Sequence, residues 1–257
     1  MLDAMFAKKI VVVTAGTSGI GKEAARLFAA SGAETVVVNG RNAKAGMQLR
    51  DDLATMFPAT RVEFIEADID DASRVDEMFT RIGEKFGRVD VLVHCGGAQV
   101  RPGLFMDLDP AMYGRQIDGH FSSFMHCCRE VIPLMHNGGA IVAIASDAGK
   151  VATPAETIIG AMKAAVIMFA RTLALEMSRQ NIRVNVITPS IVANTASYDR
   201  VMSSEFSRKL FEKAVAKAKL GVPTPADVAP IVVFLASSFA AKITGQAISV
   251  NGGISAA

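Results

Sequence analysis

Short uninterrupted apolar runs alternate along the chain with longer stretches in which apolar residues recur every three or four positions. The first run, residues 10–13, is Ile-Val-Val-Val, which is typical of a strand buried on both faces of a parallel sheet. The stretch 22–30 then places Ala25, Phe28 and Ala29 on one side, as an amphipathic helix does. A glycine-rich turn lies between them. Strand, glycine turn and helix in this order predict the nucleotide-binding start of a doubly wound α/β fold.

The same alternation continues along the rest of the chain. Further strands are predicted at residues 35–38, 62–67, 89–93, 140–145, 181–189 and 246–250. Helices are predicted at residues 45–56, from near Ala72, in a long segment that ends near residues 129–133, at residues 164–178 as a strongly amphipathic helix, and from Pro225 with Asp227 in its first turn. No linker, internal repeat or low-complexity segment interrupts the series, so we expect one domain over residues 1–257.

The first candidate chemistry lies in the glycine-rich turn. Glycines in such a turn let backbone N–H groups and the positive end of the helix approach a pyrophosphate. The alternative is an ordinary tight turn, but the strand before it and the helix after it favour the nucleotide site. The predicted cofactor contacts are Gly16, Thr17, Ser18, Gly19, Ile20 and Gly21.

The end of the second predicted strand bears on the choice of cofactor. An acid at this place would bond a ribose 2′-OH and repel a 2′-phosphate. The chain instead has Asn-Gly-Arg-Asn at residues 39–42. The guanidinium of Arg41 suits a phosphate, so Arg41 and Asn42 are predicted cofactor contacts and NADP(H) is expected over NAD(H). The alternative is a solvated loop arginine.

Composition narrows the function classes. The chain has 257 residues, 51% hydrophobic and 20% charged, with a net charge of +2. That charge indicates neither a nucleic-acid nor a membrane partner. Cys95, Cys127 and Cys128 form no paired framework, which favours a reducing cytoplasm. Residues 1–9 lack a signal-peptide pattern, and no apolar run reaches the roughly 18 residues of a membrane span.

The turn resembles the cofactor loop of the short-chain dehydrogenase/reductase family, Thr-Gly-x-x-x-Gly-Ile-Gly. Thr14, Gly19, Ile20 and Gly21 match, while Ala15 takes the place of the first glycine. The resemblance extends from Lys9 to Gly253. It implies a single-domain Rossmann fold with about seven parallel strands and helices on both faces, a nicotinamide cofactor, and a variable substrate lid at about residues 193–221.

The resemblance also assigns the catalytic residues. Ser146 matches the serine that orients the substrate, and Lys163 matches the lysine that bonds the nicotinamide ribose. The family places a tyrosine thirteen residues after the serine and four before the lysine; this chain has Ile159 there. Isoleucine neither donates nor accepts a proton, and loss of such a group typically costs about 10²–10⁴-fold in rate. The chain therefore resembles an atypical member without the active-site tyrosine.

Several residues are candidates for the missing proton donor. His120 takes the place of a family asparagine, nine residues before Arg129, and is the preferred catalytic substitute. A packing role for His120 is the alternative. Asp147, Tyr113 and Tyr198 are further candidates. Dienoyl-CoA reductases, in the same family, resemble this arrangement because they keep the lysine and protonate by another route.

Further cofactor contacts follow from the resemblance. Asp68, directly after the third strand, matches the acid that holds the adenine amino group; an N-cap is the alternative, which Asp70 or Asp71 fits better. The family's Asn-Asn-Ala-Gly after the fourth strand is His94-Cys95-Gly96-Gly97 here, and His94 is either a buried structural histidine or a cofactor contact. The remaining predicted contacts are Ile69, Cys95, Gly96, Lys163, Pro189 and Val192.

We therefore expect an NADP(H)-dependent oxidoreductase that acts on a carbonyl/alcohol pair or an activated enoyl group. The alternative is a cofactor-binding protein with non-redox or regulatory function. The lid cations Arg208, Lys209, Lys213, Lys217 and Lys219 are either a solvated face or an attraction for a phosphate-bearing acyl carrier such as CoA. The resemblance implies a homotetramer built through the long helix and the C-terminal helix and strand. No metal set is expected, since His126, Cys127 and Cys128 are interpreted as packing.

Overall fold

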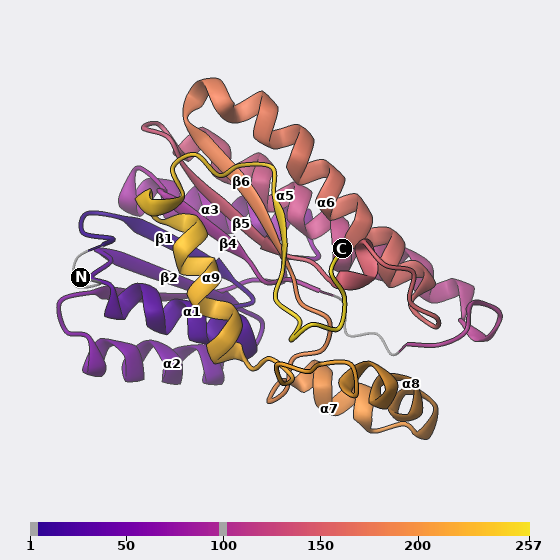
Figure 1. Ribbon diagram of the computed structural model, residues 1–257. Helices are drawn as coiled ribbons and strands as arrows, with labels where there is room; N and C mark the ends of the chain where they lie inside the picture. The colour runs from indigo at the N-terminus through magenta and orange to yellow at the C-terminus, as the bar shows by residue number, and fades with distance from the viewer. Residues whose placement is uncertain (1–4, 98–101) are drawn as a thin grey trace.

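A computed structural model describes residues 5–97 and 102–257. Residues 1–4 lie outside the described part, and they belong to the N-terminal segment in which no signal peptide is expected. Seven parallel strands form one sheet in the order β3-β2-β1-β4-β5-β6-β7. This confirms the predicted doubly wound parallel sheet (Figure 1). The strands are β1 (Ile10–Thr14), β2 (Thr35–Gly40), β3 (Arg61–Glu66), β4 (Val91–His94), β5 (Gly139–Ile144), β6 (Ile182–Thr188) and β7 (Ala247–Ser249).

The order of the strands reverses at β1. Val11 of β1 pairs with Val36 of β2 on one side and with Val91 of β4 on the other. Successive strands are added outward in opposite directions from this point, so the loops after β1 and β4 diverge. A crevice opens there at the carboxyl ends of the strands, which is where doubly wound proteins bind their ligands.

Helices cover both faces of the sheet. In Figure 1, α1, α2 and α9 lie on one face, and α3, α5 and α6 on the other. Two helices, α7 and α8, stand beyond one end of the sheet, within the predicted lid. The helices are α1 (Gly19–Ala30), α2 (Ala43–Met56), α3 (Ala72–Phe86), α4 (Tyr113–Ile117), α5 (Ser123–Val131), α6 (Thr157–Met177), α7 (Ala196–Met202), α8 (Glu205–Val215) and α9 (Pro225–Ala236).

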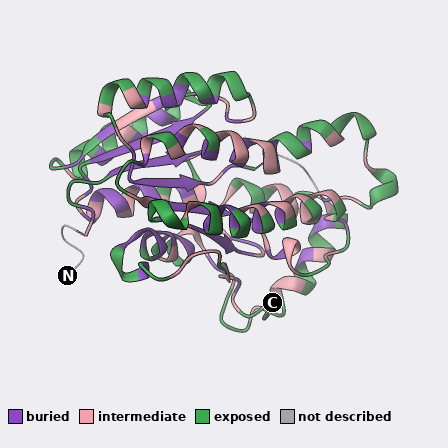
Figure 2. Cartoon of the chain, turned by 90° about the horizontal axis from the view of Figure 1, so that it is seen from above, coloured by how far each residue is buried: buried purple, intermediate pink, exposed green. Residues whose placement is uncertain are grey.

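The sheet separates two hydrophobic cores. Val11 and Val13 face the core under α1, α2 and α9, whereas Val12 faces the core under α3, α5 and α6. This alternation follows from the two-residue period of a strand. Figure 2 shows the strands buried between helices whose outer sides are exposed. With both faces covered, the strands require continuous apolar runs, as the sequence has.

Helix α6 differs from its prediction. It begins at Thr157 rather than at residue 164. Its outer side is also apolar: Met168 is 59% exposed and Leu175 is 76% exposed. By length and composition α6 qualifies as a candidate membrane span, although no uninterrupted apolar run does. Within this structure it packs on β6 and contributes Val166, Ile167 and Ala170 to the core.

Candidate active site

The glycine loop after β1 is held in a bent conformation. Ala15 has a φ of 47°, in the left-handed region that favours glycine. This explains physically why the resembled family has glycine at this place. The Gly16 N–H donates to the carbonyl oxygen of Asn39 (2.8 Å), and a Cβ added at Gly21 would stand 2.8 Å from the Ala15 carbonyl oxygen. The loop therefore lies tightly against the first turn of α1.

Asn39 is a supporting residue whose role the sequence did not indicate. It is buried at the end of β2 and accepts a hydrogen bond from the Ala15 N–H through its Oδ1 (3.3 Å). Its Nδ2 donates to the carbonyl oxygens of Ile65 and Ala67 (3.2 and 3.0 Å). Asn39 thus ties the glycine loop to β3. The only sequence signal was a polar residue ending an apolar strand.

Arg41 is the first side chain after β2 that faces the crevice. A Cβ on Gly40 would stand 2.7 Å from Cγ2 of Thr17, so an acid at position 40 would require the Thr17 side chain to move. Arg41 forms an ion pair with Asp68 across the opening (3.6 Å), with both side chains about half exposed. Asn42 is occupied as the N-cap of α2, where it accepts from the Ala45 N–H (3.0 Å).

A cleft of about 370 Å³ opens at the carboxyl ends of the strands. Most of the residues predicted as site residues line it: Ser18, Gly19, Ile20, Gly21, Arg41, Cys95, Gly96, His120, Lys163, Pro189 and Val192. Others do not line it: Gly16, Thr17, Asn42, Asp68, Ile69 and Ser146. Ile159 lines the cleft one helical turn before Lys163. The N-cap of α3 is Asp71, as its sequence position favoured.

Lys163 is a buried cation in the wall of the cleft. It is buried on α6, and its Nζ donates to the carbonyl oxygen of Ile144 (3.4 Å). Burial lowers the pKa of Lys163 to about 8. A Cβ on Gly97 would stand 4.0 Å from Nζ of Lys163 and 3.6 Å from Nδ1 of His120. Lysine and imidazole therefore converge on one point of the cleft wall.

His120 projects from an irregular turn of helix. Residues 118–122 adopt a π-helical turn between α4 and α5, a feature often found at functional sites. The ring is buried, and neither nitrogen has a hydrogen-bond partner among the described residues. Burial, and secondarily the charge of Lys163, lower the pKa of His120 to about 3. The imidazole is thus neutral near pH 7 and has both nitrogens available for a ligand.

Of the two interpretations of His94, the structure supports the buried structural histidine. Its Nδ1 lies 3.1 Å from Oγ1 of Thr14, and its Nε2 lies 3.5 Å from Oγ of Ser123. Burial first, and then Lys163, lower the pKa of His94 to about 3. The neighbouring thiol of Cys95 stays protonated, because burial raises its pKa to about 12.

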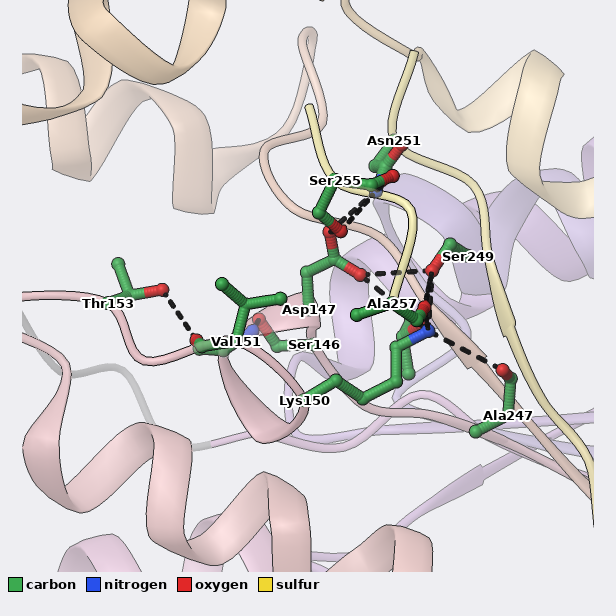
Figure 3. Close-up of polar contacts among 12 residues, drawn as sticks. Ser146, Asp147, Lys150, Val151, Thr153, Ala247, Ser249, Asn251, Ser255 and Ala257 are labelled. Atoms are coloured by element: carbon green, nitrogen blue, oxygen red, sulfur yellow. Dashed lines mark hydrogen bonds and ion pairs between the residues drawn. The ribbon is translucent and has the colours of Figure 1, made fainter. Parts of the chain in front are cut away.

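Ser146 and Asp147 begin the short turn after β5. Oγ of Ser146 accepts from the Ala148 N–H (3.2 Å). Figure 3 shows the Asp147 carboxylate engaged by the C-terminal segment. It accepts hydrogen bonds from Ser249 (3.1 Å), Asn251 (2.5 Å) and Ser255 (2.5 Å). Asp147, a predicted alternative proton donor, is therefore committed to holding the C-terminus and is outside the main cleft.

A second cavity of about 270 Å³ adjoins the cleft beneath α8. Glu156, Ser190 and Phe211 line both spaces. Glu156 belongs to no recognised motif, and sequence reasoning missed it. Tyr198 lines the cleft from α7, whereas Tyr113 stacks on Phe105 at 6.1 Å between ring centroids and does not line the cleft.

The described residues bring no three His, Cys, Asp or Glu side chains together in a way suited to a metal ion. His126 is partly buried, and Cys127 and Cys128 are buried in the core beneath α5. The cleft is therefore lined by backbone and apolar side chains together with a few polar groups, among them Lys163 and the neutral imidazole of His120, and not by a metal-binding cluster of described residues.

Comparison with known proteins decides the family. The family described as Enoyl-(Acyl carrier protein) reductase matches residues 14–255. A 3-oxoacyl-(acyl-carrier-protein) reductase of Chlamydia muridarum is 33% identical over 98% of this chain and all of its own. A 7alpha-hydroxysteroid dehydrogenase of Bacteroides fragilis is 32% identical over 97% of this chain and 95% of its own. This chain belongs to the short-chain dehydrogenase/reductase family.

Solved structures of the family superpose closely. A 7α-hydroxysteroid dehydrogenase complexed with NADH and 7-oxo glycochenodeoxycholic acid gives a TM-score of 0.88 at 29% identity, covering 98% of this chain and 95% of its own. A short-chain type dehydrogenase/reductase from Mycobacterium ulcerans gives 0.89 at 26% identity, covering 97% and 90%. These relatives are oxidoreductases, which supports an enzyme of this class.

Proposed function

We propose that the protein is an NADP(H)-dependent oxidoreductase that reduces a carbonyl or activated enoyl substrate, with a proton donor other than residue 159. One observation carries this proposal: the glycine loop at the start of α1, Arg41 and the buried Lys163 line a single cleft at the switch point of the sheet. A nicotinamide dinucleotide fits these residues, and when bound it would supply the hydride.

Each end of the cleft has its own task. Backbone N–H groups at Ser18–Gly21 would bind the pyrophosphate at the positive end of α1. Arg41 would pair with a 2′-phosphate, in exchange for its half-exposed ion pair with Asp68. Lys163 would bond the nicotinamide ribose, and the unpartnered nitrogens of His120 would bond the substrate oxygen or a water beside it. Ser146, which the family pattern would make the substrate-orienting serine, does not line the cleft here, so it would take that role only once its Oγ released the Ala148 N–H and turned towards the cleft.

The lid favours an acyl thioester as substrate class. Lys213 and Lys217 line the second cavity, next to the apolar side chains of Leu210 and Phe211. An acyl chain would pack against the apolar side chains of that lining, and an anionic carrier group at its end would lie near the lysines. The printed names of relatives include reductases of acyl carrier protein substrates.

Cofactor binding and turnover test the proposal in two stages. Titration with NADPH and NADH, followed by nicotinamide fluorescence, should give tighter binding of NADPH. Arg41→Ala should weaken NADPH binding about tenfold or more and leave NADH binding nearly unchanged, because a charge-assisted hydrogen bond contributes about 1.5–3 kcal/mol. Acetoacetyl-CoA, simple ketones and enoyl thioesters should then be screened for NADPH oxidation. Equal affinities for the two cofactors in both proteins would contradict the NADP assignment.

Ile159 favours a second candidate function. An isoleucine in the cleft one turn from Lys163 is also what a non-redox or regulatory member would have. That candidate predicts NADPH binding with no oxidation on any substrate of the screen. Product formation without a change in nicotinamide absorbance would indicate isomerase or lyase chemistry instead.

We also propose a homotetramer in a reducing cytoplasm. The exposed apolar side of α6, including Met168 and Leu175, supports association with further copies of the chain. Three free cysteines, two of them buried, suit a reducing compartment. Light scattering on the purified protein should give the mass of four chains.

A further inference from the structure

The cleft contains one carboxyl group with no role in the scheme above, that of Glu156. Glu156 immediately precedes α6. Residues 159 and 163 are four apart within α6, which places their side chains on one face of the helix. Both line the cleft, as Glu156 does. Glu156 is the N-cap residue, with a non-helical φ of -115° and ψ of 31°, so it reaches the cleft from just before the helix that carries Ile159 and Lys163.

The backbone around Glu156 is fixed on both sides. Ala155 is buried with a φ of 69°, a left-handed conformation that a residue with a Cβ adopts where its surroundings impose it. Its carbonyl oxygen accepts from the Gly103 N–H (2.9 Å). The carbonyl oxygen of Glu156 accepts from the Gly160 N–H (2.6 Å). The turn that presents Glu156 to the cleft is thus well determined.

The surroundings of Glu156 favour its protonated form. Burial raises the pKa of Glu156 to about 7, with no charged group among the described residues opposing it. A substantial share of the carboxyl groups therefore carries a proton near neutral pH. The charged and titratable groups that share the two cavities with it are Arg41, Cys95, His120, Lys163, Tyr198 and Arg200 in the cleft, and Asp147, Lys213 and Lys217 in the second cavity.

We propose that Glu156 is the general acid of carbonyl reduction in this protein and supplies the proton that Ile159 cannot donate. The assignment rests on the proposed oxidoreductase function. The substrate carbonyl carbon accepts a hydride from the reduced nicotinamide, and the π electron pair moves to oxygen. The O–H bond of Glu156 breaks as a new O–H bond forms on that oxygen. The products are the alcohol, the oxidised nicotinamide and the Glu156 carboxylate, which regains a proton from water.

The other candidates are less suited to this step. His120 is neutral near pH 7 and has no imidazolium proton to give. The Asp147 carboxylate accepts three hydrogen bonds from the C-terminal segment. Tyr198 lines the cleft from the lid helix α7 and not from the α6 face that carries Lys163. Of these four groups, Glu156 is the one that combines an acidic proton with a place in the cleft next to the start of the helix that carries Ile159 and Lys163.

Glu156→Gln tests the assignment, because it keeps the shape of the side chain and removes the proton. Its kcat for NADPH-dependent reduction of acetoacetyl-CoA should fall about 10²-fold or more, with the Kd for NADPH unchanged. The wild-type kcat should decline as the pH rises above about 7, since the acid form is the active one. Glu176→Gln, on the exposed side of the same helix, should behave as wild type.

Two further measurements make the result decisive. Carbon-13 NMR of the cofactor-free protein, labelled at glutamate carboxyl groups, should contain one resonance titrating near pH 7 that is absent in Glu156→Gln. The double variant E156Q/I159Y should recover at least part of the lost kcat, because a phenol one turn before Lys163 restores the family's arrangement.

Three outcomes overturn the assignment. A kcat that survives Glu156→Gln with an unchanged pH profile removes Glu156 from the mechanism. If Tyr198→Phe loses kcat while Glu156→Gln stays fully active, the proton donor is Tyr198 of the lid and not Glu156. If the wild-type protein binds NADPH but none of the screened substrates causes its oxidation, the proposed function is contradicted, and the assignment with it. The NMR titration separates that last case, because it still reports the Glu156 proton.

Discussion

The imidazole ring of His94 occupies the space into which any side chain on residue 96 would extend. A Cβ on Gly96 would stand 2.7 Å from Nε2 of His94 and 2.6 Å from Cδ1 of Ile69. The ring cannot easily yield, because Thr14 and Ser123 hold its two nitrogens. The family pattern has Asn and Ala at positions 94 and 96. The departures of this chain from that pattern at residues 94 and 96 are therefore physically linked.

Gly96→Ala should destabilise the protein more when His94 is present than when it is replaced, since Ile69 remains close to the added Cβ in either case. Overpacking of this kind typically lowers the free energy of unfolding by about 1–3 kcal/mol. In a His94→Asn background the cost should shrink, giving a coupling energy of about 0.5–3 kcal/mol in a double-mutant cycle measured by urea unfolding. Gly114→Ala is a matched control, since nothing lies within 4 Å of its added Cβ. Equal costs of Gly96→Ala in both backgrounds would refute the link.

Ala15→Gly should stabilise the cofactor loop. Ala15 has a φ of 47°, and the left-handed region costs a residue with a Cβ about 1–2 kcal/mol. Glycine removes that strain but gains freedom in the unfolded chain, so the net increase in the free energy of unfolding should be up to about 1 kcal/mol. Ala54→Gly, in the exposed interior of α2, should have the opposite sign, by about 1 kcal/mol. Urea unfolding of both variants measures this difference, and a destabilised Ala15→Gly would contradict it.

The buried histidines should make stability fall in acid. Burial lowers the pKa of His94 and of His120 from the ordinary value of 6.5 to about 3. The unfolded chain therefore binds more protons than the folded one between these values. The stabilisation is fully present above pH 6.5 and is lost as the pH falls towards 3.

The acid sensitivity should depend measurably on one histidine. Between pH 6.5 and pH 5, His94 alone should account for about 2 kcal/mol of lost unfolding free energy. His94→Asn should remove that share, so its unfolding free energy should depend less steeply on pH than that of the wild type. Urea unfolding at a series of pH values gives both slopes. Parallel pH profiles for the two proteins would show that the His94 ring titrates normally in the folded state.

A charge on the outer side of α6 should disrupt association. Leu175 is 76% exposed in the isolated chain. If further copies cover it, Leu175→Glu places an unpaired carboxylate in an apolar interface, and light scattering should give a smaller mass than for the wild type. Met56→Glu, on the exposed end of α2, should leave the mass unchanged. A wild-type protein with the mass of one chain would exclude the tetramer directly.

The arrangement of the fold was predictable because its signals are local. Four consecutive apolar residues before a glycine turn and a helix already imply a strand with both faces covered, and the structure has that strand as β1. The capping acid of α3 and the first turn of α9 were likewise predictable, because capping depends on side chains within three residues of the helix start. Strand ends were predicted less accurately, since they depend on pairing with distant segments. The start of α6 was predicted less accurately because its N-cap residue, Glu156, makes no side-chain capping hydrogen bond.

By itself, the sequence determined the doubly wound fold, the family and the absence of a tyrosine side chain at residue 159, because each is written in short-range patterns. Only the tertiary structure decided how the remaining polar groups are used. The Asp147 carboxylate accepts hydrogen bonds from a C-terminal segment more than a hundred residues away. The His120 nitrogens have no partner among the described residues, and Glu156 lies in the cleft. Burial and the neighbours of a side chain set its protonation and availability, and both come from contacts between segments far apart in the chain.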